Sequence, residues 1–189
     1  MILTISRKTL FKCPLARPAF LFLLVPTLLG KLGPKPWKTL LVHSGYCTIG
    51  LLAFVLILTP LSKFLPKLRL KRYRRTTGIT VFLYASFHLM CVLIKTIQKK
   101  GGLPLDYFFH PVVYTGLGAY MILLLLTVTS NDWSVRTLGY IYWKRLHRFV
   151  YVAEGLLFIH IFQKSTLWAL VIFIPLVAIQ LLGKLRECR

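Results

Sequence analysis

The sequence predicts an all-α integral membrane protein, a six-transmembrane-helix bundle with both termini in the cytoplasm. Hydrophobic residues make up 57% of the 189 residues and charged residues only 15%, which is too apolar for an ordinary soluble domain. Several runs approach the roughly 20 apolar residues that cross a hydrocarbon core of about 30 Å. Only helices and closed barrels satisfy their backbone polar groups in lipid, and these runs are too long for barrel strands, so the spans are helical.

Charge and cysteine usage exclude two other classes of protein. The net charge is +21, from 25 Lys and Arg against 4 Asp and Glu. In a soluble protein this excess would suggest nucleic acid. Here the charges cluster between apolar runs, which indicates membrane topology and attraction to anionic lipid instead. The four cysteines form no C-x-x-C pair and have no zinc-ligand spacing, so neither a disulfide framework nor an Fe–S centre is indicated.

Residues 1–189 are expected to form a single domain without an internal repeat or a soluble part. The predicted spans are residues 18–32, 43–64, 77–97, 111–130, 146–162 and 166–183. The first is short and contains Pro26. Basic residues precede it as in a signal peptide, but no A-x-A-like cleavage site follows, so we interpret it as a signal-anchor-like span.

The distribution of basic residues predicts the orientation. Most of the 25 Lys and Arg lie in the N-terminal segment, the loops 62–75 and 131–148, and the C-terminal tail. By the positive-inside rule these segments are cytoplasmic. The third and fifth spans therefore both run from inside to outside and are parallel.

Two histidines lie well inside predicted spans. His88 follows Arg75 by thirteen residues, and His160 follows His147 by thirteen. At about 1.5 Å per residue both lie roughly 20 Å from the inner surface. A lone imidazole in hydrocarbon needs only a carbonyl or hydroxyl partner. Two imidazoles at matching depth on parallel helices are instead typical of a four-helix core that holds a haem iron. Zinc is less favoured, because it needs four ligands and no further Cys or Asp lies at that depth.

His147 lies near the cytoplasmic interface, between Arg145 and Arg148. It is either an interfacial anchor or a ligand of a second haem nearer the cytoplasm. Thirteen residues turn a helix by about 1300°, so His147 and His160 face different directions and do not share one narrow site.

The remaining polar groups carry weaker expectations. Glu154 is interpreted as a packed carboxyl of the bundle in preference to a catalytic one. His43 opens the second span on the outer side, either as a helix-start residue or as a contact for a quinone. His110 precedes Pro111 in an outer loop and is interpreted as a turn residue.

Residues from about 43 to 163 resemble, in order, the MsrQ (YedZ) family, the haem-binding membrane subunits of the bacterial protein-methionine-sulfoxide reductase system. That family belongs to the wider ferric-reductase-like transmembrane group. The most specific pattern is W-x-x-L-H-R-x-V-Y with a histidine thirteen residues after the first. The segments that carry the resemblance are "LILTPL", "RRTTGITVFLYASFHL", "PVVYTGLGAYMILLLLTVTS" and "LGYIYWKRLHRFVYVAEGLLFIH".

The resemblance implies a haem b electron-transfer subunit in the bacterial inner (cytoplasmic) membrane. Such a subunit takes electrons from the quinone pool, directly or through a flavin (FMN). It passes them to a periplasmic molybdenum-containing methionine-sulfoxide reductase, which repairs oxidised proteins. The family's motif histidines map onto His88, His147 and His160. Oxidase relatives carry a further histidine about fourteen residues before His88, where this chain has Arg74, so the expected number of haems is one or two.

The arginines around the inner ends of the third and fifth spans suit an anion. A guanidinium group binds phosphate through two parallel hydrogen bonds, so these arginines are candidates to bind the phosphate of a flavin, and the alternative is that they only enforce topology. The candidates are Arg74, Arg75, Arg145 and Arg148.

Three alternatives compete with an electron-transfer subunit. A ferric or oxygen reductase-type cytochrome normally needs a cytoplasmic flavin/NADPH domain, which we do not find before Arg189. A small proton-coupled transporter would use Glu154 and the histidines as a relay and would show no Soret absorption. A structural anchor leaves the matched histidines unexplained. We therefore expect a subunit of an oxidoreductase rather than a stand-alone catalyst.

Overall fold

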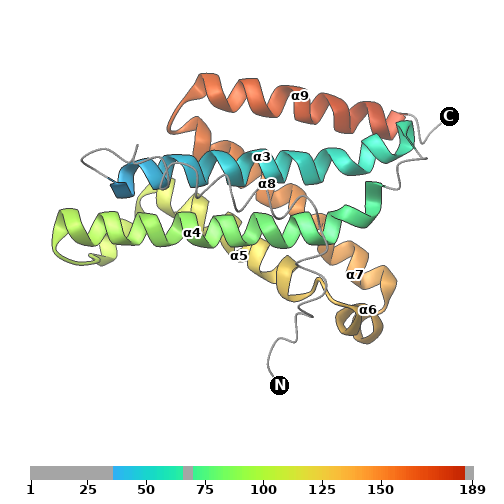
Figure 1. Cartoon of the computed structure of the whole chain (residues 1–189), viewed down its shortest axis with the longest axis horizontal. Coiled ribbons are helices and arrows are strands. Elements are labelled where there is room, and N and C mark those ends of the chain that lie inside the picture. Colours follow the sequence, from blue (N-terminus) through green and yellow to red (C-terminus); the bar gives the residue numbers. More distant parts are fainter. Residues whose placement is uncertain (1–35, 66–69, 186–189) are drawn as a thin grey trace. The chain divides into compact units, whose positions relative to one another are not determined.

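The computed structural model describes residues 36–65 and 70–185, which form helices and turns without any strand (Figure 1). The chain divides into two compact units, Met1–Lys99 and Lys100–Arg189. These are two halves of what the sequence analysis treats as one domain, and each half is built around its own pair of long helices.

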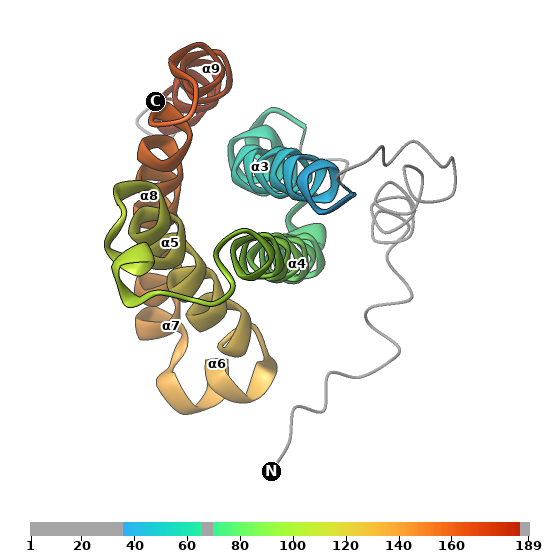
Figure 2. The ribbon, with the colours of Figure 1, turned by 90° about the vertical axis from the view of Figure 1, so that its left-hand side faces the viewer.

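The described part of the first unit contains two long helices and a short 3-10 turn that directly precedes the second of them. These are α3 (Pro36–Phe64), the 3-10 turn η2 (Leu70–Tyr73) and α4 (Arg74–Lys100). At about 1.5 Å per residue each long helix exceeds the roughly 30 Å of a hydrocarbon core. The two helices lie side by side and run in opposite directions (Figures 1 and 2). Leu58 of α3, and Val81 and Cys91 of α4, are among the most deeply buried apolar side chains.

The second unit is a hairpin of helices to which a last helix is added. Helix α5 packs along α8, and α8 also contacts α9 (Figure 2). In chain order the elements are η3 (Leu105–Phe109), α5 (Pro111–Val128), α6 (Asp132–Leu138), α7 (Tyr140–Leu146), η4 (His147–Phe149), α8 (Val150–Phe162) and α9 (Thr166–Leu185).

Local sequence explains where several of these elements begin. Pro111 opens α5, where its fixed φ suits a first helical position and its missing N–H costs nothing. The side chain of Asn131 caps α6 by accepting a hydrogen bond of 2.7 Å from the N–H of Ser134. Gly139, at φ 76°, separates α6 from α7 in a conformation that other residues rarely adopt.

Among residues 36–65 and 70–185, four helices are long and apolar enough to cross a membrane: Trp37–Phe64, Arg74–Lys100, Pro111–Val128 and Thr166–Leu185. They confirm the second, third, fourth and sixth predicted spans as helices of membrane length. The first predicted span, residues 18–32, lies outside the described residues. The side of the membrane on which each terminus lies stays a prediction from the charge distribution.

The fifth predicted span, residues 146–162, differs from the structure in its boundaries. Helix α8 has only 13 residues and begins at Val150. It is preceded by the tighter turn η4 and by α7, so the helical path extends back to Tyr140. The backbone stays in the helical region through the joint, with ψ close to −10° at His147 and Phe149. The sequence pattern therefore located the apolar part of this path but not its tightened turn.

A buried polar pair joins α8 to α9. Glu154 is only 6% exposed. The side-chain amide Nε2 of Gln180 donates to both carboxyl oxygens, at 3.0 Å to Oε1 and 3.2 Å to Oε2. Phe158 and Phe173 pack edge to face in the same interface, with ring centroids 5.4 Å apart. Glu154 is thus a packed carboxyl with an interhelical partner, a common way for polar side chains to join membrane helices.

We expect Gln180→Leu to lower the free energy of unfolding in detergent by about 1–3 kcal/mol, because the buried carboxyl loses its donor. The double variant Glu154→Leu/Gln180→Leu is expected to recover most of this loss, since no buried polar group remains without a partner. Thermal unfolding followed by circular dichroism measures both. Gln98→Leu, at an exposed position of α4, is the control. Equal losses in the single and double variants would show that the hydrogen bonds contribute little.

Candidate functional site

His88 projects from α4 against the backbone of α3. Its Nδ1 lies 3.0 Å from the carbonyl oxygen of Leu41 and 3.2 Å from Oγ of Ser44. The Ser44 hydroxyl itself donates to the Leu41 carbonyl at 3.0 Å. A carbonyl oxygen can only accept, so the hydrogen-bond pattern assigns the proton of the neutral ring to Nδ1. The lone pair of this imidazole is therefore on Nε2.

His160 has the same relation to a different helix. It projects from α8 against α5, and its Nδ1 lies 2.8 Å from the carbonyl oxygen of Val112. The proton is again assigned to Nδ1. None of the residues that the structure describes forms a hydrogen bond with Nε2 of His160. The carbonyl therefore satisfies one of the two ring nitrogens and leaves the lone pair of the other for a ligand.

This arrangement suits metal ligation. Metal-binding histidines usually donate their second ring N–H to a carbonyl or carboxylate, which fixes the tautomer and the ring orientation and raises the basicity of the ligating nitrogen. Within the described ranges no three His, Cys, Asp or Glu side chains gather as a metal site. The two imidazoles are thus suited to a group such as haem, whose iron needs only axial ligands from the protein.

His147 is held through its other nitrogen. Its Nε2 lies 3.2 Å from Oγ1 of Thr129, and the Thr129 hydroxyl donates to the Leu125 carbonyl at 2.8 Å, so His147 is the donor at Nε2. The ring of Trp143 packs against the imidazole with centroids 4.1 Å apart, and its Nε1 donates to the Thr129 carbonyl at 2.9 Å. Thr129 and Trp143 therefore hold His147 at the joint between the end of α5 and the start of α8.

The four candidate arginines lie in different units. Arg74 and Arg75 are exposed at the start of α4, whereas Arg145 and Arg148 are exposed around the end of α7. The guanidinium of Arg145 lies 5.8 Å from the ring centroid of Tyr142, a cation–π arrangement. A phosphate contact by these arginines stays a prediction.

The two outer histidines are settled differently. Helix α3 begins at Pro36, seven residues before His43, so His43 is not a helix-start residue. Hydropathy marked only the apolar part of this longer helix. A quinone contact at His43 stays a prediction. The interpretation of His110 as a turn residue is confirmed. It precedes α5, and its backbone N–H bonds to the carbonyl of Tyr107 at 3.3 Å.

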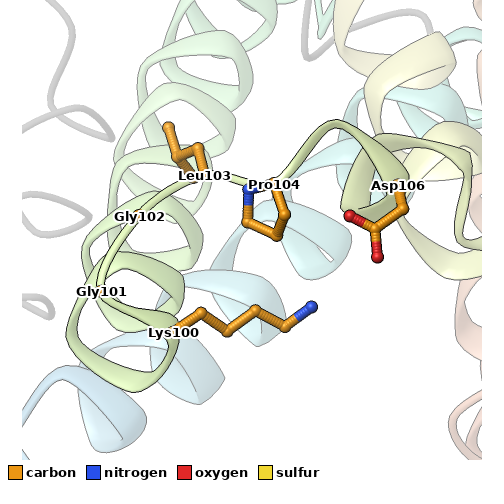
Figure 3. Close-up of a pocket in the computed structure, with 6 residues that line it drawn as sticks. All are labelled: Lys100, Gly101, Gly102, Leu103, Pro104 and Asp106. Atoms are coloured by element: carbon orange, nitrogen blue, oxygen red, sulfur yellow. The ribbon is translucent and has the colours of Figure 1, made fainter.

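A pocket of about 600 Å³ lies at the turn that follows α4 (Figure 3). None of the histidines described above lines it. Gly101, at φ 72°, permits the turn, and the side chains of Lys100 and Asp106 lie at its two sides. Its lining residues are Lys100, Gly101, Gly102, Leu103, Pro104 and Asp106.

Sequence reasoning did not identify the partners of these side chains. The carbonyls of Leu41 and Val112 have no sequence signal, because every residue carries a carbonyl. Gln180 did have a sequence signal, because a glutamine in an apolar span needs a hydrogen-bond partner as much as Glu154 does.

Comparison with known proteins adds independent information. The sequence model of the family described as "Ferric reductase like transmembrane component" matches residues 44–158. This range includes His88 and His147 and ends two residues before His160. No solved structure matches the chain.

Three relatives bear the name "Protein-methionine-sulfoxide reductase heme-binding subunit MsrQ". The protein from Caulobacter vibrioides is 36% identical over 125 residues, which are 65% of this chain and 59% of the relative. Those from Brucella ovis and Brucella canis are each 32% identical over 159 residues, which are 82% of this chain and 71% of the relative. The chain thus spans less than two thirds of the Caulobacter protein's length.

Proposed function

Because the chain belongs to the ferric reductase-like transmembrane family, we propose that it is a haem b electron-transfer subunit of a methionine-sulfoxide reductase system. The observation that carries the proposal is that His88 and His160 form matching hydrogen bonds. In each unit an imidazole donates from Nδ1 to a carbonyl of the neighbouring helix, which leaves the lone pair on Nε2. The relatives are named as haem-binding subunits, in agreement with this chemistry.

His88 and His160 are the residues that we propose would hold one haem b. Their equal distance along the chain from the predicted inner ends of their spans supports this pairing. Haem b, when bound, supplies a one-electron redox centre. The chain's own contribution is to hold both rings in one tautomer and one orientation in a setting of apolar helices. His147, whose Nε2 bonds to Thr129, is proposed to act nearer the electron donor rather than as a ligand of this haem.

The proposed reaction balances without another co-reactant. A quinol that becomes a quinone releases two electrons and two protons. A methionine sulfoxide that becomes methionine consumes two electrons and two protons and releases one water molecule. The chain conducts the electrons singly from the quinone pool, directly or through FMN at the arginines, across the bacterial inner membrane. The recipient is a periplasmic molybdenum-containing catalytic subunit.

The second candidate is a ferric or oxygen reductase-type cytochrome, which the description of the matching family favours. It shares the haem but not the recipient of the electrons. A proton-coupled transporter is distinguished by its visible spectrum, since it would show no Soret band.

We expect His88→Ala and His160→Ala each to remove most of the low-spin haem signal from the visible spectrum of the purified protein. An axial imidazole is lost in each case, and alanine supplies no lone pair. His110→Ala, in the turn before α5, is the matched control and should keep the spectrum. Normal spectra in both ligand variants would refute the assignment.

Reconstituted in liposomes with a quinol and a periplasmic-type molybdenum methionine-sulfoxide reductase, the chain is expected to support reduction of methionine sulfoxide. Omission of the chain, or its replacement by the His88→Ala variant, should abolish the coupling. Product formation is measured by chromatography. Rapid NADPH oxidation or ferric reduction by the chain alone would support the second candidate instead.

The His147→Ala variant is expected to keep the haem spectrum and its reduction by dithionite, but to lose reduction by quinol. His147 lies roughly 20 Å from His160 along the helical path, and in the predicted orientation it is nearer the cytoplasmic side, where we propose that the donor binds. Stopped-flow absorbance at the haem band measures both reductions. If quinol reduces the variant at the wild-type rate, His147 is only an interfacial anchor.

A further inference from the structure

The two candidate ligands lie against the same five-residue pattern. It reads "LVHSG" at residues 41–45 of α3 and "VVYTG" at residues 112–116 of α5. In each copy the carbonyl of the first residue accepts from the histidine Nδ1. In each copy the hydroxyl of the fourth residue also lies within hydrogen-bond distance of that carbonyl, at 3.0 Å from Ser44 and 3.2 Å from Thr115. The shorter bond of the Thr115 hydroxyl, 2.9 Å, goes to the carbonyl of Pro111. No internal repeat is expected from the sequence, and this pattern is short enough to be overlooked within apolar runs.

The fifth residue of each copy is a glycine on which the imidazole lies. A Cβ added at Gly116 would be 2.9 Å from both Cε1 and Nδ1 of His160. A Cβ added at Gly45 would be 3.1 Å from Cε1 and 3.3 Å from Nδ1 of His88. The first distance is shorter than real side chains tolerate, and the second is tighter than ordinary van der Waals contact. Each ring is therefore seated directly on helix backbone.

Other helical glycines lack this relation. A Cβ at Gly50 of α3, Gly78 of α4 or Gly155 of α8 would meet no atom within 4 Å beyond its own helix and neighbours. A Cβ at Gly118 of α5 would meet Cδ1 of Leu156 at 3.3 Å, an aliphatic side chain. Among these glycines, close approach to an imidazole is found at the two positions that follow a histidine-bound carbonyl by one helical turn. The carbonyl accepts from Nδ1, and the glycine lies against the Cε1–Nδ1 side of the ring, so together they leave the ring little freedom to rotate or shift.

We propose that Gly45 and Gly116 are positioning residues for the two haem-ligating imidazoles, and that the repeated pattern is a duplicated seat that sets the plane of each ring. This inference rests on the proposed function. A methyl group at Gly116 forces the His160 ring away from the Val112 carbonyl. The same change at Gly45 acts on His88 in the same direction but less strongly, because its contacts are longer.

The test compares Gly116→Ala and Gly45→Ala with two controls, Gly155→Ala on α8, the helix of His160, and Gly50→Ala on α3, the helix that His88 contacts. The readouts are haem retained after purification and the largest g value in the low-temperature electron paramagnetic resonance spectrum, which reports the relative planes of axial imidazoles. We expect Gly116→Ala to weaken haem retention about tenfold or more and to shift the g value. Gly45→Ala should give a smaller change, and the controls none.

A haem-independent readout separates failure of the inference from failure of the proposed function. In haem-free protein labelled with ¹⁵N-histidine, Gly116→Ala should move the Nδ1 resonance of His160, whereas Gly155→Ala should not. If the wild type binds no haem, the proposed function fails. The Nδ1 resonance of His160 still tests whether Gly116 positions the ring. If the wild type binds haem but Gly116→Ala matches Gly155→Ala in every readout, the inference is overturned.

A milder variant covers the case in which Gly116→Ala does not fold. Thr115→Val keeps the side-chain shape but removes the hydroxyl that bonds to the Pro111 carbonyl at 2.9 Å and lies 3.2 Å from the Val112 carbonyl, the acceptor of His160. The carbonyl then accepts from His160 without this competitor, so we expect shifts of the g value and the Nδ1 resonance in a folded protein. An unchanged g value and an unchanged resonance would overturn the inference.

Discussion

An imidazole surrounded by apolar helices has two nitrogens to satisfy, and the bond from Nδ1 to a backbone carbonyl is the interaction on which each unit depends. It joins α4 to α3 through His88 and Leu41, and α8 to α5 through His160 and Val112. Unsatisfied polar groups are costly in lipid, so a histidine that bonds across a helix pair also fixes how that pair packs. The same bond decides the tautomer, so packing and ligand chemistry are determined together.

The polar groups nearer the predicted cytoplasmic end of α8 follow a different rule. His147 and Glu154 bond to side chains, Thr129 and Gln180, rather than to carbonyls alone. A side-chain partner can change rotamer, whereas a helix carbonyl is held by its own helix. The second unit therefore has a rigidly held imidazole at His160 and more adjustable polar contacts around the start of α8.

The sequence predicted most of the fold because apolar run length is a strong signal for α3, α4, α5 and α9. It misjudged the start of α8, since a 3-10 turn at His147 depends on backbone torsions that hydropathy does not encode. His88 and His160 were identified as candidate ligands from their depth alone. Their hydrogen-bond acceptors were not identified, because carbonyls are uniform along a chain. Gly45 and Gly116 were overlooked because single glycines are common in membrane helices, and only the three-dimensional contact distinguishes these two from Gly50 or Gly155.

The use of main-chain carbonyls as partners has an evolutionary consequence. No substitution of Leu41 or Val112 removes the oxygen that each histidine needs, and the two copies already differ at this position, as they do at the residue after the shared valine. The hydrogen bond of each histidine therefore does not depend on which residue supplies the carbonyl. The position that does depend on residue type is the glycine, Gly45 or Gly116, where an added side chain would meet the imidazole. The contacts of each imidazole thus constrain the sequence of the facing helix at Gly45 and Gly116, where a hydrogen atom cannot be replaced by a methyl group unless the ring shifts.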